Sequence, residues 1–135
     1  MIAARRLAAL ALASAAALPA PAAAQCDGPG RKVESERLVV VYRTVPAKVA
    51  VGQHFAVEAR VCAKGAGAAP TALRVDADMP AHRHGMNYRA KVSAKGDGRY
   101  VAEGLLFHMP GRWRFVFDVD AGGRTERLAA DLDLE

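Results

Sequence analysis

The strongest constraint on the fold is a period-two alternation of apolar and mostly charged residues near the C-terminus. It is clearest around four apolar positions, Trp113, Phe115, Phe117 and Val119. Successive side chains of a β-strand point to opposite faces, so this pattern predicts a strand with one buried face. No 3.6-residue repeat of the kind that favours an amphipathic helix appears after residue 25. The main part of the chain is therefore expected to be all-β.

Similar segments recur at regular spacing, with turn-forming residues between them. The expected strands are residues 38–42, 55–61, 73–79, 88–92, 99–107, 113–119 and 128–134. Glycine and proline mark the intervening turns, most clearly at residues 95–98, 110–111 and 121–123. About seven short strands in roughly 110 residues predict an immunoglobulin-like antiparallel β-sandwich.

The first 24 residues have the features of a signal peptide. Arg5 and Arg6 precede an apolar run over residues 7–18, and small residues follow at 22–24. We expect a signal peptide at 1–24, an extended tail at 25–37 and one domain at 38–135. The run is shorter than the ~20 residues of a spanning helix, so no stable membrane span is expected after cleavage. An uncleaved anchor is the alternative, and the mature protein is expected to be periplasmic or secreted.

The two cysteines, Cys26 and Cys62, both follow the predicted cleavage site. An even pair in an exported chain favours a disulfide bond. A redox role is disfavoured because the pair is not arranged as Cys-x-x-Cys. A lipid anchor is also disfavoured, because Gln25 stands where a lipid-attachment signal needs a small residue.

Histidine and methionine are concentrated in two short segments, residues 78–87 and 107–111. Of the four histidines only His54 lies outside these segments, and of the four methionines only Met1 does. Imidazole and thioether groups share lone pairs that suit soft or borderline metals, above all copper. Zinc is less favoured because thioethers contribute little to zinc sites. Each residue taken alone has an ordinary explanation, since methionine often fills gaps in a core and Met79 is in phase with the apolar face of its strand.

The distribution as a whole predicts a copper ion, as Cu(I), bound where the two segments meet. The candidate ligands are Met79, His82, His84, Met86, His108 and Met109. His54 is interpreted as structural. The expected role is delivery, storage or buffering of copper, with a membrane or periplasmic protein that receives copper as a possible partner. The alternative is a module that binds no metal and uses the same end of the sandwich as a protein contact surface.

Other function classes are disfavoured by the sequence. The net charge of +5 comes with no basic run interleaved with aromatic residues, so nucleic acid is not expected as a partner. No Ser/His/Asp or Cys/His arrangement is visible, and no paired carboxylates accompany the histidines. We therefore expect no enzymatic activity. A copper redox enzyme stays a third alternative.

Three segments together resemble the YtkA-like domain family and its FixH relatives. They are Met79-Pro80-Ala81-His82-Arg83-His84-Gly85-Met86, then Gly98-Arg99-Tyr100, then Phe107-His108-Met109-Pro110-Gly111-Arg112-Trp113. The resemblance implies a small exported or membrane-anchored immunoglobulin-like sandwich, in some members linked with copper handling and oxidase assembly. The residues it carries over are Met79, His82, His84, Met86 and Met109. FixH-type members keep a membrane anchor, whereas this chain is expected to lose its apolar segment by cleavage.

Overall fold

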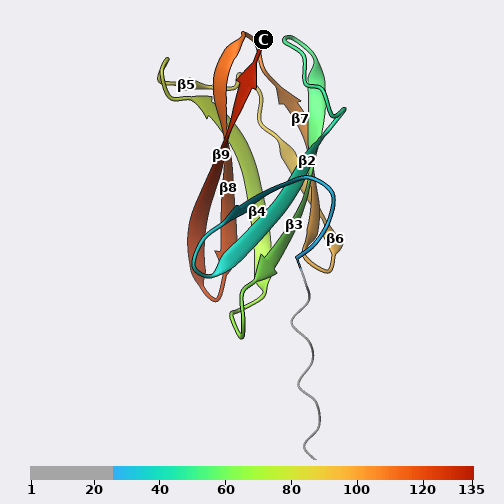
Figure 1. The fold of residues 1–135 in the computed structure, drawn as a ribbon, viewed down its shortest axis with the longest axis vertical. Coiled ribbons are helices and arrows are strands. Elements are labelled where there is room, and N and C mark those ends of the chain that lie inside the picture. The colour runs from blue at the N-terminus through green and yellow to red at the C-terminus, as the bar shows by residue number, and fades with distance from the viewer. Residues whose placement is uncertain (1–25) are drawn as a thin grey trace, which may run out of the picture.

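The computed structural model describes residues 26–135, and the predicted signal peptide lies outside them. The described residues form nine strands and no helix (Figure 1). The strands are β1 (Arg31–Glu34), β2 (Leu38–Val45), β3 (His54–Ala63), β4 (Pro70–Met79), β5 (His84–Gly85), β6 (Lys91–Gly96), β7 (Arg99–Leu106), β8 (Gly111–Ala121) and β9 (Arg124–Leu134). Among these residues there is accordingly no helix with the length and apolar character needed to cross a membrane.

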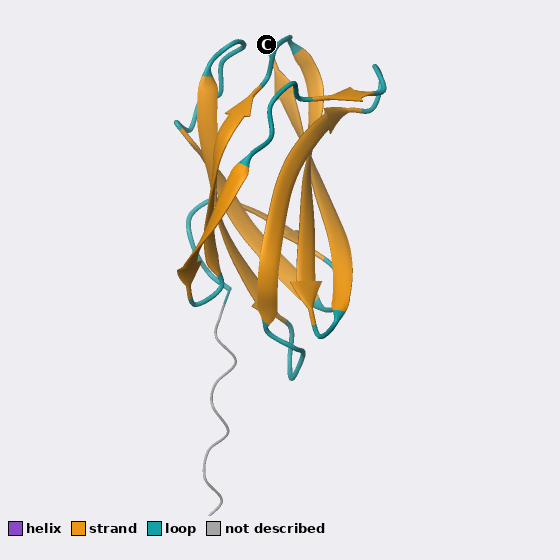
Figure 2. Ribbon diagram, turned by 180° about the vertical axis from the view of Figure 1, so that it is seen from behind, coloured by secondary structure: helices purple, strands orange, loops and turns teal. Residues whose placement is uncertain are grey.

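The strands form two antiparallel sheets that pack face to face (Figure 2). One sheet has the order β1-β2-β3-β7-β6, and the other has the order β5-β4-β8-β9. Without β1 and β5, these orders are those of the A-B-E-D and C-F-G sheets of an immunoglobulin domain. The fold class predicted from the sequence is therefore confirmed. The two strands beyond the expected set, β1 and β5, are both short edge strands.

The core lies between the sheets and is built by the alternation seen in the sequence. On β8 the side chains of Trp113, Phe117 and Val119 are fully buried, and Phe115 is nearly so. Aromatic rings contact one another along the core, from Phe107 stacked on Trp113 at 4.4 Å to the Phe117 ring 4.8 Å from Tyr42. Such pairs stabilise a core beyond the area that they bury.

Two of the predicted turns have the backbone geometry of tight hairpins. Asp97 and Gly98 between β6 and β7 both have positive φ, and so do Gly122 and Gly123 between β8 and β9. Positive φ at both central residues is typical of the type I′ turn, whose twist matches that of the flanking strands. Gly98 is also sterically required, because a Cβ atom there would lie 2.3 Å from the carbonyl oxygen of Val61.

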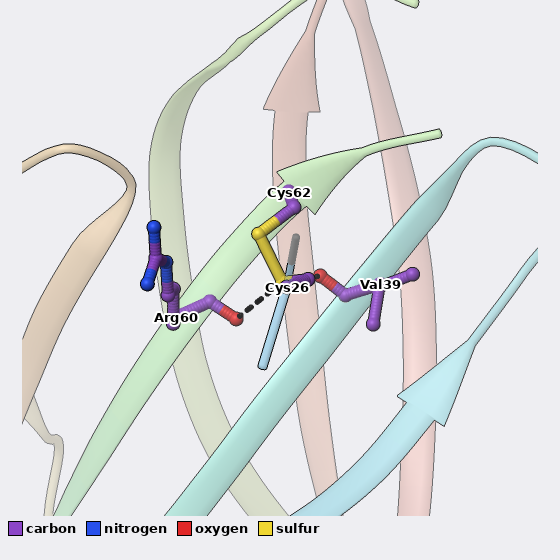
Figure 3. The surroundings of a disulfide bond; sticks show 4 residues. All are labelled: Cys26, Val39, Arg60 and Cys62. Atoms are coloured by element: carbon purple, nitrogen blue, oxygen red, sulfur yellow. Dashed lines mark hydrogen bonds between the residues drawn. A yellow bond between two sulfur atoms is a disulfide. The ribbon is translucent and has the colours of Figure 1, made fainter. Parts of the chain in front are cut away.

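Strand β1 forms within the segment expected to be a tail, and several contacts fix it. A disulfide joins Cys26 to Cys62 near the end of β3, as predicted. Figure 3 shows the sulfur of Cys26 beside two backbone carbonyl oxygens, 3.7 Å from that of Val39 and 3.9 Å from that of Arg60. The Arg31 side chain donates a hydrogen bond to the carbonyl oxygen of Asp131 on β9, 2.9 Å away. The N-terminal segment is thus part of the sandwich.

Removal of the disulfide should destabilise the domain without changing its fold. The bridge spans a sequence separation of 36 residues, for which chain entropy predicts a loss of about 3–4 kcal/mol. The measurement is chemical unfolding of the Cys26→Ser/Cys62→Ser variant against the oxidised parent. The reduced parent is the matched control and should unfold at the same denaturant concentration as the variant. Equal stability of oxidised and reduced protein would contradict the prediction.

Candidate functional site

The two segments rich in histidine and methionine meet at one end of the sandwich. Strand β4 ends at Met79 where its neighbour β8 begins, and β7 ends beside the start of β3. The connections at residues 80–83 and 107–110 therefore lie at the same end, which also carries β5 and the C-terminus (Figure 1). The fold brings together residues that the sequence separates by more than twenty positions.

A tight turn after β4 places the first pair of histidines. The amide of His82 donates to the carbonyl oxygen of Met79 at 3.0 Å, and Arg83 has a positive φ of 56°. This reversal lets β5 pair back onto β4, with His84 directly opposite Met79. His82 and His84 thus approach each other through a turn, and not as alternate residues of one extended strand. Positive φ at a residue with a Cβ atom carries a conformational cost, which the paired strands offset.

The imidazole rings of three histidines form a row. The centroid of the His84 ring lies 5.7 Å from that of His82 and 5.1 Å from that of His108. The fully buried indole of Trp113 lies beneath the row, with its centroid 5.4 Å from His108 and 6.0 Å from His84. Two rings of the row therefore pack against an aromatic side chain of the core.

The ring nitrogens of His84 and His108 have different environments. Nδ1 of His84 lies 3.2 Å from the carbonyl oxygen of Gly85, which can only accept, so the imidazole donates there. That hydrogen bond leaves Nε2 of His84 with its lone pair, the arrangement that a metal-binding histidine needs. Nδ1 of His108 is buried and has no hydrogen-bond partner among the described residues. A buried polar atom without a partner is costly, so this nitrogen calls for an explanation.

The three methionines differ in burial. Met79 is 1% exposed and belongs to the core, and a Cβ atom added at Gly111 would lie 2.7 Å from its methyl carbon. Met86 and Met109 are only partly buried and pack against the edge of the core. The backbone carbonyl of Met109 accepts a hydrogen bond from the Trp113 indole at 3.0 Å. Trp113 therefore positions the second segment, a role the sequence analysis did not assign although it placed the residue on the buried face.

Carboxylate and thiolate side chains of the described residues do not add a set of metal ligands to the histidine row. Within residues 26–135 no group of three or more His, Cys, Asp or Glu side chains is arranged to hold a metal ion. None of the ion pairs in this part of the chain includes a histidine. His54 lies apart from the row, with its ring 5.0 Å from that of Tyr88. Any metal bound here would depend on imidazole nitrogens together with thioether sulfurs.

Comparison with known proteins identifies the family. The model of the family described as YtkA-like matches residues 32–117, from β1 into β8, and so includes both segments of the site. The chain belongs to the YtkA-like family. No curated protein and no solved structure matches it. The resemblance seen in the sequence is thus confirmed at the level of the family.

The close approach of Gly111 to Met79 makes the packing beneath the site sensitive to one added methyl group. Gly111 has a φ of 125°, and its added Cβ atom would collide with the Met79 side chain. Gly111→Ala should therefore cost about 1–3 kcal/mol of unfolding free energy, measured by chemical denaturation. Adding Met79→Ala, which removes the obstructing methyl group, should reduce the further cost of Gly111→Ala. Strictly additive losses would show that the collision is absent and that only the backbone conformation matters.

Proposed function

We propose that this protein binds Cu(I) at the histidine row, using imidazole nitrogens of His84 and His108 and thioether sulfurs of Met86 and Met109. The single observation that carries the proposal is the buried, unpartnered Nδ1 of His108 beside the His84 ring. Native structures rarely leave a buried nitrogen without a partner, and an unseen ligand is one established reason for an exception. His82 lies next in the row and is exposed, so it would act at the entrance.

The donor set supports copper over other metals. Thioethers are soft ligands that select Cu(I), whereas imidazole binds copper and zinc alike. Magnesium and calcium prefer oxygen ligands, which the row does not supply. Met79 is fully enclosed by the core, so we assign it to packing beneath the site. The half-buried Met86 and Met109 are the better candidates for sulfur ligands.

The exposure of the row at its His82 end supports transfer or buffering of copper, and no catalytic role is proposed. A site at the end of a sandwich, open at His82, allows a partner protein to approach the ion directly. Delivery to a copper-receiving periplasmic or membrane protein, storage and buffering all fit this geometry. The Cys26–Cys62 disulfide is compatible with an oxidising compartment outside the cytoplasm. The proposed location is the periplasm or the exterior of the cell.

A second candidate function, protein contact without metal, is favoured by the distribution of exposed apolar residues. Large hydrophobic side chains exposed among the described residues are Val45 at 43%, Val51 at 37% and Tyr88 at 47%. Val45 ends β2, Val51 lies in the following loop, and Tyr88 contacts His54 at the start of β3. All three therefore lie at the same end as the histidine row. A partner could dock there with or without a metal ion.

Loss of the two thioethers should weaken Cu(I) binding more than Zn(II) binding. The variant Met86→Leu/Met109→Leu keeps apolar volume nearly constant, so each change should cost less than ~1.5 kcal/mol of stability. We expect Cu(I) affinity, measured by competition with a chromogenic chelator, to fall by about tenfold or more. Met79→Leu is the matched control and should leave Cu(I) affinity unchanged. Unchanged Cu(I) affinity in the double variant would show that these sulfurs are not ligands.

Replacement of His108 tests whether the second segment contributes to the site. His108→Phe keeps an aromatic ring over Trp113 and removes both nitrogens, so the fold should persist while Cu(I) affinity falls by about tenfold or more. His54→Ala removes a histidine outside the row and is the control. If His108→Phe binds Cu(I) as the parent does and is also more stable, His108 is a packing residue and the contact surface becomes the favoured function.

A further inference from the structure

A second potential site lies on the outer face of the five-stranded sheet, away from the histidine row. Here the segment at Asp27–Pro29 and the strands β2, β3, β7 and β6 line an open groove of about 400 Å³. That volume is within the range of small-molecule sites, which is roughly 300–1,000 Å³. The Cys26–Cys62 disulfide holds the N-terminal segment against the sheet, and this segment forms one wall of the groove. It is a built feature of the fold, present before any ligand arrives.

The charges of this groove are poorly balanced. Arg60 on β3 and Arg99 on β7 are direct neighbours across the two strands. Like charges at directly opposed positions of a sheet destabilise it. Lys95 on β6 lines the same groove. The acids that line it are Asp27 and Glu58, and Glu58 is engaged by Arg43 at 2.6 Å.

Of the 17 basic side chains in residues 26–135, ten form no ion pair, and three of these ten line this groove. Ion pairs with carboxylates engage many basic residues of the sandwich, namely Arg37, Arg43, Lys64, Arg74, Arg112, Arg114 and Arg127. Within the same residues no carboxylate lies within ion-pair distance of Arg60, Lys95 or Arg99. Arg60, Lys95 and Arg99 are thus three cations gathered in one groove, each without an ion pair.

Arg60 provides a second, independent observation. Its Nε atom is buried and has no hydrogen-bond partner among the described residues. An arginine guanidinium carries five N–H donors in a fixed fork that matches carboxylate and phosphate oxygens. A buried donor of this kind costs free energy unless an acceptor reaches it. An anion in the groove would accept hydrogen bonds from the guanidinium of Arg60 and relieve its repulsion with Arg99.

We propose that this groove binds a small oxyanion that carries more than one carboxylate or phosphoryl group. Arg60 and Arg99 hold one anionic group between them, and Lys95 binds a second group at the β6 side. Val41 and Val101 offer apolar surface to a short carbon skeleton. The groove is separate from the histidine row, so this site stands whether or not the protein binds copper.

The test uses metal-free mature protein and two probes, tricarballylate and pyrophosphate, with acetate and chloride at matched ionic strength as controls. Binding is followed by ¹⁵N NMR of the arginine Nε–H groups and by calorimetry. We expect saturable binding of at least one probe with a shift of the Arg60 Nε–H signal. Preference between the probes identifies a carboxylate or a phosphoryl ligand. No saturable binding of either probe, or equal shifts with acetate, would overturn the proposal.

Variants locate the site. Arg60→Gln and Arg99→Gln should each weaken binding by about tenfold or more, because each removes charge-assisted hydrogen bonds. Arg124→Gln removes the same charge from an exposed position on β9 and should leave binding unchanged. Lys95→Gln, on the exposed β6 edge, should also weaken binding, and it replaces Arg60→Gln as the test if that variant does not fold. Equal weakening by Arg124→Gln would show general attraction to a basic protein and would overturn the site.

Discussion

The structure depends on the burial of one face of β8. Trp113, Phe115, Phe117 and Val119 project from this strand into the space between the sheets, and both neighbouring strands, β4 and β9, pair along most of its length. Burial of a large apolar side chain stabilises a fold by roughly 1.5–3 kcal/mol, so this face outweighs any single polar contact. The aromatic contacts with Tyr42 and Phe107 join it to the opposite sheet. Without this face the two sheets would have no common core.

The same face links the core to the histidine row. Trp113 stacks on Phe107, donates to the carbonyl of Met109 and lies under two imidazole rings. Its position is fixed by packing on one side and by a hydrogen bond on the other. The rings of His84 and His108 are therefore supported by a fully buried side chain of the core. Changes at the site and changes in stability must be measured together for this reason.

Much of the fold followed from the sequence, because long half-buried strands carry a strong period-two signal. The short strands were missed because they carry almost none. β1 has one apolar residue, Val33, and is held by β2 and the disulfide, while β5 has only His84 and Gly85. The grouping of histidine and methionine was visible in the sequence. The left-handed backbone at Arg83 was not, since a positive φ at arginine depends on the surrounding strands and not on local preference. The oxyanion groove was also missed, because strand register alone brings Arg60 opposite Arg99.

The disulfide and the histidine row lie toward opposite ends of strand β3. Cys62 lies near the C-terminal end of β3, whereas the histidine row lies near the end where β3 begins. Through its bond to Cys62, Cys26 therefore joins the sandwich away from the end that carries the histidines. Were the chain tethered to a lipid bilayer through residues before Cys26, the imidazoles would face away from the bilayer. The same polarity would let many such molecules on one surface present their histidine rows on the same side.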